Sequence, residues 1–80
     1  MYTIEVNNEY RNDGYDYADD FCPMFYWTVR NENSENVGES DWAYGFMTIS
    51  QACEVARRYT SGSFAVMIEG ETHFFDAVED

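Results

Sequence analysis

The sequence predicts an α+β fold: a single small antiparallel β-sheet of about four or five strands with one α-helix packed on one face. Three observations support this. Apolar and polar residues alternate with a period of two in several short segments, as is typical of half-buried strands. Residues 48–61 instead repeat their apolar residues at the helical spacing, behind a helix cap. Runs of Asn, Asp, Ser and Gly separate these segments. The predicted order is β-β-β-α-β-β, and residues 1–80 form one domain.

Three strands are predicted before the helix. Residues 2–6 alternate apolar and polar side chains, and residues 24–30 form the most apolar and aromatic of the three segments. Residues 42–46 also alternate. They either pair with 24–30 as a long-looped antiparallel hairpin or lead directly into the helix.

Two segments between these strands lack the alternation. Residues 7–20 and residues 31–41 are rich in Asn, Asp, Ser and Gly, which favour turns. Both are also acidic. We therefore expect two exposed acidic loops, of which the first is the longer.

The helix has recognisable ends. Thr48 and Gln51 match a capping box, in which each side chain bonds to the backbone of the other residue. Ser61 and Gly62 supply a stop signal. The apolar stripe between these ends consists mainly of small residues, which suits close packing on a sheet: Ile49, Ala52, Cys53, Ala56 and Tyr59.

Two further strands follow the helix. Residues 63–69 are apolar on both faces, as expected for a central strand. Gly70 and Glu71 are predicted to form a two-residue turn of type II′, because this turn prefers glycine at its first position. Residues 72–78 then return as the antiparallel partner.

The charge balance narrows the class of partner. The chain has sixteen acidic residues, four arginines and no lysine, for a net charge of −12. A direct nucleic-acid binder needs a basic face, and an anionic membrane surface attracts basic segments, so we expect neither. High net charge also accompanies disorder, but 45% of the chain is hydrophobic and 19% aromatic, which predicts a folded domain. The expected partner is basic.

The two cysteines indicate a reducing compartment. Cys22 and Cys53 make at most one disulfide, and neither belongs to a C-x-x-C motif. Cys53 falls on the apolar face of the predicted helix, where a buried reduced thiol is common. There is no basic segment followed by an apolar stretch at the start and no apolar run of about 20 residues. We therefore expect a cytoplasmic protein with no membrane partner.

Catalysis, metals and cofactors are not expected. His73 is the sole histidine, and no nucleophile and base stand in a recognisable arrangement around it. Residues 12–20 offer several oxygen ligands of the kind that calcium prefers, but the EF-hand spacing is absent. A solvated acidic loop or weak calcium binding are the two interpretations of that segment. The prediction is a protein that is not an enzyme and has no metal or cofactor.

The candidate site is therefore an acidic protein-binding surface. Such a surface steers a basic partner and can occupy the place of a phosphate backbone. Tyrosines between the acids would supply contact area, since tyrosine is enriched at interfaces. The predicted partner-binding residues are Asp13, Tyr15, Asp16, Tyr17, Asp19, Asp20, Glu32, Glu35, Glu39 and Asp41. In the simpler interpretation, these acids serve solubility and the tyrosines pack on the sheet.

A small, acidic, lysine-free chain with a short sheet and one helix resembles the phage-encoded inhibitors of host defence, such as anti-CRISPR proteins and DNA-mimic anti-restriction proteins. The resemblance covers size, charge and inferred architecture, and no shared motif carries it. It implies stoichiometric binding to the basic nucleic-acid-binding surface of a protein or ribonucleoprotein complex, in the cytoplasm of the host cell, so that nucleic acid is blocked without chemistry.

Three alternatives remain open. An antitoxin or immunity-type protein that neutralises a basic nuclease would rely on the same electrostatics. A structural or assembly protein would use its aromatic excess to form a homo-oligomer. Adaptation to high salt also yields many acids and little lysine, although the aromatic content argues against it.

Overall fold

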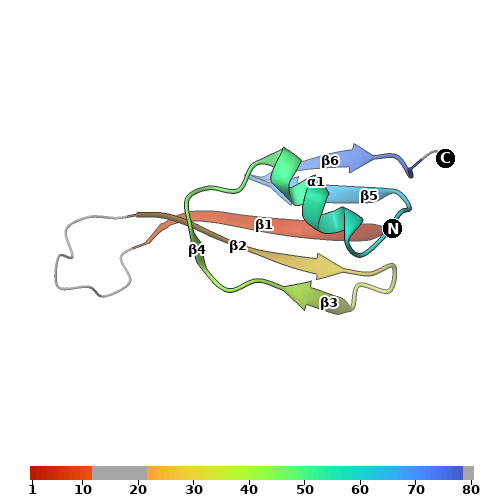
Figure 1. Cartoon of the computed structure of the whole chain (residues 1–80), viewed down its shortest axis with the longest axis horizontal. Helices are drawn as coiled ribbons and strands as arrows, with labels where there is room; N and C mark the ends of the chain where they lie inside the picture. The colour runs from red at the N-terminus through yellow and green to blue at the C-terminus, as the bar shows by residue number, and fades with distance from the viewer. Residues whose placement is uncertain (12–21, 79–80) are drawn as a thin grey trace.

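The computed structural model describes residues 1–11 and 22–78, which contain six strands and one helix. Figure 1 shows the helix lying across one face of the sheet. The elements in chain order are β1 (Tyr2–Arg11), β2 (Cys22–Arg30), β3 (Asn36–Glu39), β4 (Ala43–Tyr44), α1 (Ile49–Arg57), β5 (Phe64–Ile68) and β6 (Glu71–Phe75).

The strands form one mixed sheet in the order β3-β2-β1-β5-β6, and β4 also pairs with β2. This confirms the α+β class, with a helix between the early and late strands. The sheet differs from the prediction in one respect, because β1 and β5 run parallel while the other pairs are antiparallel. The reason lies in the helix: α1 returns the chain along the sheet, so the strand that follows enters in the direction of β1.

The hydrophobic core lies between the helix and one face of the sheet. Alternate residues of β1, β2 and β5 point toward the helix, and Ile4, Val29 and Val66 are at most 1% exposed. Ala52 and Ala56 are the helix residues closest to full burial. Small side chains at these positions let the helix lie close to the sheet, as the sequence predicts.

The predicted helix start is confirmed. The Thr48 hydroxyl accepts a hydrogen bond from the Gln51 amide (3.2 Å), and the Gln51 side chain accepts one from the Thr48 amide (2.9 Å). The helix ends at Arg57, earlier than the predicted boundary near residue 61. The amides of Tyr59 and Thr60 still bond to the Ala56 carbonyl, as a closing turn. Tyr59 leaves the helix and packs its ring edge-on against Trp27.

The prediction that residues 7–20 form a loop is wrong for its first part, since β1 continues to Arg11. Nine residue pairs join β1 to β2, from Thr3–Arg30 to Arg11–Cys22. Polar residues such as Asn7 and Asn8 are accommodated because each has a cross-strand partner or a side-chain hydrogen bond. The remainder of that segment lies outside the described residues.

Asn8 joins the far part of β1 to the helix. Its side-chain amide donates to the Met47 carbonyl (3.1 Å), and its side-chain oxygen accepts from the Met47 amide (2.9 Å). The side chain thus satisfies both backbone groups of the residue before the helix cap. Met47 itself is buried in the core.

The second predicted loop, residues 31–41, contains the short strand β3, so that prediction is also incorrect in part. β3 pairs with the end of β2 through an irregular register between Val29 and Arg30. Of residues 42–46, only β4 pairs with β2, opposite Met24 and Phe25. Both interpretations of that segment therefore hold in part, because a two-residue pairing is followed by a lead-in to the helix.

The turn between β5 and β6 lies one residue earlier than predicted. Ile68 pairs with Glu71, so Glu69 and Gly70 form the two-residue turn. Both have positive φ, 53° and 78°. This is the sign pattern of a type I′ turn rather than type II′. Type I′ matches the twist of the flanking strands, although it places a glutamate in the left-handed region.

The turn yields a stability prediction. Replacing Glu69 with Asn should raise the free energy of unfolding by about 0.5–1 kcal/mol, because Asn tolerates the left-handed conformation better than Glu. Urea denaturation followed by tryptophan fluorescence measures it. Glu71→Gln is the matched control, since it removes a nearby charge without altering the turn; an equal gain in both variants would assign the effect to charge.

A second prediction concerns Gly38. A Cβ built on Gly38 would overlap the ring and hydroxyl of Tyr59. Gly38→Ala should therefore destabilise the fold by about 1–3 kcal/mol, the usual cost of overpacking. The same substitution combined with Tyr59→Leu should cost clearly less than the sum of the two single changes in a double-mutant cycle. Additive costs would show that Gly38 is needed for a reason other than this contact.

Candidate interaction surface

The predicted residues Glu32 and Glu35 are exposed in the turn after β2. The Asn31 side chain shapes this turn by accepting hydrogen bonds from the amides of Asn33 (2.9 Å) and Glu35 (3.0 Å). Ser34 takes up a positive φ of 64°. The local hydrogen bonds satisfy the turn backbone and leave both carboxylates in solvent.

Glu39 and Asp41 lie on either side of Ser40, which closes the edge between β3 and β4. Ser40 exchanges hydrogen bonds with the Trp27 backbone, with its hydroxyl accepting at 2.9 Å and its amide donating at 2.9 Å. Glu39 pairs with Thr28, which places its side chain on the face of the sheet that the helix does not cover. Both acids are exposed.

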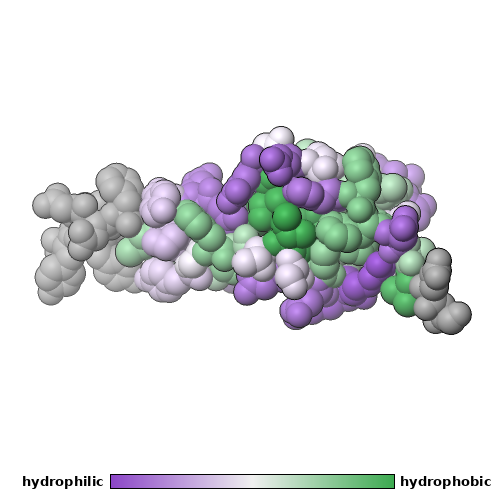
Figure 2. Space-filling model, turned by 90° about the horizontal axis from the view of Figure 1, so that it is seen from above, coloured by the Kyte–Doolittle hydropathy of each residue, from purple (hydrophilic) through white to green (hydrophobic). Residues whose placement is uncertain are grey.

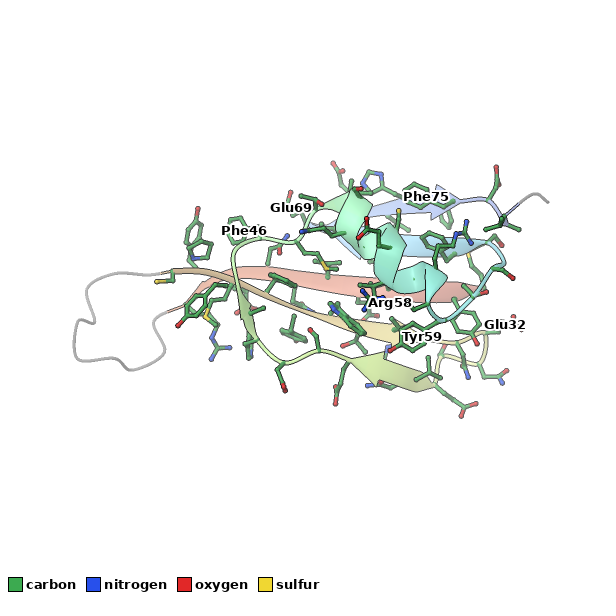
Figure 3. All side chains as sticks on the ribbon, viewed as in Figure 1. Glu32, Phe46, Arg58, Tyr59, Glu69 and Phe75 are labelled. Atoms are coloured by element: carbon green, nitrogen blue, oxygen red, sulfur yellow. The ribbon has the colours of Figure 1, made fainter. Side chains whose placement is uncertain are left out.

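The other predicted residues lie outside the described residues: Asp13, Tyr15, Asp16, Tyr17, Asp19 and Asp20. Their segment connects Arg11 to Cys22, and Cys22 is the first residue of β2. The two ends of this nine-residue strand are about 26 Å apart. Glu32 and Glu35 follow the other end, and Figure 3 shows Glu32 at the end of the molecule opposite Phe46. The length of β2 therefore separates Glu32 and Glu35 from the point where the first group joins the sheet. Glu39 lies opposite Thr28, and Asp41 comes two residues before Ala43, so both lie part of the way back along β2 toward Cys22.

Two aromatic contacts lie on the part of β1 and β2 that extends beyond the helix, one on each face of the sheet. Tyr10 contacts Phe46 edge-on, with ring centroids 5.0 Å apart, and Tyr26 contacts Trp42 at 4.5 Å. Tyr10 is 66% exposed. The alternation along 42–46 predicts Trp42 and Phe46 on one side, but their rings contact opposite faces of the sheet, because only residues 43–44 pair with β2.

The arginines are engaged within the molecule. Arg30 lies 3.5 Å from the Glu5 carboxylate, and the Arg11 guanidinium lies over the Trp42 ring at 4.1 Å. Arg57 donates to the carbonyls of Gly62 (2.7 Å) and Asp76 (2.6 Å) and lies over the ring of Phe64. Three of the four positive side chains thus serve internal contacts.

The acidic side chains are distributed differently. Ten of the sixteen acids and all four arginines fall in the described residues, a formal charge of −6 out of −12. Of these ten, nine are exposed and Glu5 is half-buried. The outer surface of the described part is therefore negative on several sides rather than in one patch.

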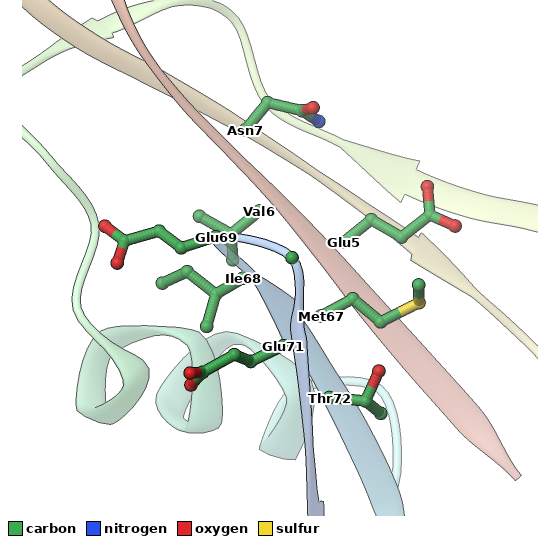
Figure 4. A pocket seen from close by; sticks show the side chains of 9 residues that line it. Glu5, Val6, Asn7, Met67, Ile68, Glu69, Glu71 and Thr72 are labelled. Carbon is green, nitrogen blue, oxygen red and sulfur yellow. The ribbon is translucent and has the colours of Figure 1, made fainter.

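A shallow pocket of about 380 Å³ lies at the turn between β5 and β6. Figure 4 shows Glu5, Met67 and Thr72 projecting from one side of the strands, and Glu69 and Glu71 from the other. Glu5, which lies 3.5 Å from Arg30, is the carboxylate on the first side, and Glu69 and Glu71 add two more on the other. The surroundings of the pocket therefore favour a cationic side chain over phosphate.

The geometry offers no centre for metal chemistry among the described residues, which contain no group of three or more His, Cys, Asp or Glu able to hold an ion. His73 lies on β6 with Nε2 3.2 Å from the Glu71 carboxylate, a contact whose angles do not make a hydrogen bond. In the same described part, no helix is long and apolar enough to span a membrane.

Comparisons of the chain with protein family models, with curated proteins and with solved structures found no match. The function must therefore be argued from the residues themselves.

The two free cysteines differ in environment, which gives a third prediction. Cys22 is exposed, whereas Cys53 is half-buried on the helix. Burial raises the pKa of the Cys53 thiol, and the charge of Arg57 opposes this rise only in part. At pH 8, Cys22 should react first with a chromogenic disulfide reagent, and Cys53 should react about tenfold more slowly or only in urea. The Cys22→Ser variant identifies the two thiols, because only the slow phase of the reaction should remain in it. A fast phase that remains in this variant would contradict the assignment.

Proposed function

We propose that this protein is a non-enzymatic acidic inhibitor that binds the basic nucleic-acid-binding surface of a host defence complex in the cytoplasm and blocks nucleic-acid binding. The observation that supports the proposal is that positive and negative side chains have different surroundings. Three of the four arginines make internal contacts, while nine of the ten described acidic residues are exposed.

This distribution supports a binding role because exposed charges act over the distance of a diffusional encounter. A strongly negative surface raises the association rate with a positive one by about 10–10³-fold, and it repels nucleic acid. A nucleic-acid-binding protein must itself display a basic surface. An acidic protein seated there excludes the phosphate backbone without catalysis.

Exposed aromatic residues favour one alternative, the oligomeric assembly protein. Tyr44 and Phe74 are 69% and 71% exposed, and such side chains are common at protein interfaces. Self-association would bring together two chains of charge −12 each, which opposes it at low salt. The sedimentation profile separates the two functions, since an assembly protein gains mass with concentration in the absence of a basic partner.

A capture experiment tests the proposal. The immobilised protein should retain a basic nucleic-acid-binding protein or complex from a host lysate, and excess duplex DNA or RNA should displace it. Replacing Asp16, Asp19 and Asp20 by Asn, Ser and Asn should slow association with that partner about tenfold and flatten its salt dependence. The matched control neutralises three acids outside the predicted groups: Glu54, Glu79 and Asp80.

The outcomes discriminate between mechanisms. An equal effect in both triple variants would show that total charge, not a site, governs binding. Loss confined to a Glu32→Gln, Glu35→Gln variant would move the site to the turn after β2. Retention of the partner despite nucleic-acid competitor would exclude occlusion of the nucleic-acid site, and an empty column would overturn the proposal.

A further inference from the structure

Strand β6 is an open edge of the sheet. Among the described residues it pairs only with β5, at the end of the strand order. Asp76, beyond its end, bonds through its carbonyl to Arg57, and the Val78 amide donates to the Ser61 carbonyl. The chain after β6 thus turns back toward the loop after α1 as far as residue 78, and no residue in the described ranges 1–11 and 22–78 pairs with the outer backbone of β6.

The turn geometry determines which backbone groups face outward. In a two-residue hairpin the closing pair, here Ile68 and Glu71, exchanges both hydrogen bonds. Hydrogen-bonded and non-hydrogen-bonded pairs then alternate along an antiparallel ladder. The N–H and C=O groups of Thr72 and Phe74 therefore point away from β5, toward solvent.

These two residues also carry the side chains of the helix-free face. Phe74 pairs with Ala65, Thr72 pairs with Met67, and Phe74 is 71% exposed while Met67 is 42% exposed. An apolar strip thus runs from Phe74 to Met67 beside the open edge. It ends at the pocket that Glu5 and Thr72 help to line.

This edge lacks the features that normally prevent strand addition. Proteins protect edges with Lys, Pro, bulges or covering loops. The β5–β6 register is regular, and residues 64–75 contain no Lys, Arg or Pro. The opposite edge, by contrast, has a shifted register at Val29–Arg30 and the Ser40 hydrogen bonds to Trp27.

The surroundings of the edge are acidic. Glu69, Glu71 and Asp76 are exposed at or beside the ends of β6. Seen from the β6 side, apolar surface lies among strongly hydrophilic residues (Figure 2). The charge complementarity therefore favours a cationic strand, and it disfavours a second copy of this acidic chain.

We propose that β6 receives an added antiparallel strand from the basic partner, with an apolar side chain opposite Phe74 and a Lys or Arg two residues along, opposite Thr72 and next to the pocket. Alternate residues of the added strand share one face, which sets this spacing. The added strand exchanges hydrogen bonds with the outward N–H and C=O groups of Thr72 and Phe74. The inference rests on the proposed function in taking the partner to be basic.

A peptide titration followed by NMR tests it. The probe is a capped eight-residue peptide with Thr at odd positions and alternating Phe and Arg at even positions; its control carries Glu in place of Arg. With the Arg peptide, the amides of Thr72 and Phe74 should shift and become protected from hydrogen exchange, while those of Glu71, His73 and Phe75 are protected already. The Glu peptide should bind at least about tenfold more weakly.

Two variants locate the contact. Phe74→Thr should weaken binding of the Arg peptide about tenfold, because the apolar contact is lost. Thr72→Pro should also weaken its binding, because the outward N–H donor of residue 72 is removed. Val37→Thr, an equivalent change on the opposite edge strand, should bind as the wild type does. Circular dichroism and the Tm confirm that each variant is folded.

Several results would overturn the proposal: no shift at millimolar peptide, shifts centred on Tyr10 and Phe46 instead, or equal binding of the Glu peptide. Protection of Thr72 and Phe74 that grows with protein concentration alone would assign the edge to a second copy. If the captured partner binds the Phe74→Thr variant as it binds the wild type, the proposed inhibitor function stands but strand addition at β6 is wrong. If the Arg peptide binds at β6 but no basic partner is captured, strand addition stands but the proposed inhibitor function is wrong.

Discussion

The parallel pairing of β1 with β5 is the constraint on which the rest of the structure depends. Parallel strands need a crossover connection, and α1 is the helix that supplies it. A single crossover helix covers a single face of the sheet. The core therefore forms on that face alone, around Ile4, Val66 and Phe64, and the other face remains in contact with solvent.

The uncovered face and the two edges of the sheet are stabilised by other contacts. Arg30 and Glu5 pair on that face, and Trp42 packs there against Tyr26, so polar and aromatic contacts take the place of a second layer. β3, β4 and Ser40 occupy the outer edge of β2. The β6 edge has no such cover from the described residues, and its apolar side chains meet water beside exposed carboxylates.

Local signals in the sequence predicted local structure well. Thr48 and Gln51 form the capping box, and Ala52 and Ala56 pack on the sheet, because capping and helical spacing depend on residues a few positions apart. Asn7 to Arg11 were assigned to a loop by composition, yet they form strand, because pairing with β2 outweighs intrinsic turn preference. The direction of β5 relative to β1 is a long-range property that no local pattern encodes.

The sequence predicted the negative charge of the candidate surface, but not where its acidic residues lie on the fold. Exposure of Glu32, Glu35, Glu39 and Asp41 follows from their chemistry, since unpaired carboxylates are rarely buried. The separation of Glu32 and Glu35 from the segment after Arg11 follows from the length of β2, which can be calculated only once the strand boundaries are known. Glu39 and Asp41 lie between these two places because β3 and β4 return along β2. The exposure of Phe74 was not predictable, because Phe74 and Phe75 are adjacent and point to opposite faces of the sheet. Which of them faces inward depends on the position of the preceding turn, and that turn lies one residue earlier than expected.

The central position of β1 also affects how the chain is made. β2 follows β1 closely, but β5 comes much later, since Tyr2 pairs with Phe64, 62 positions along the chain. Until β5 leaves the ribosome, the hairpin of β1 and β2 has an unpaired inner edge and an uncovered apolar face, and an isolated hairpin is only marginally stable. The pairing of β1 with β5 therefore forms late, after most of the chain has been made, and such long-range pairing is slow. The negative charge of the chain also keeps incomplete chains on neighbouring ribosomes apart.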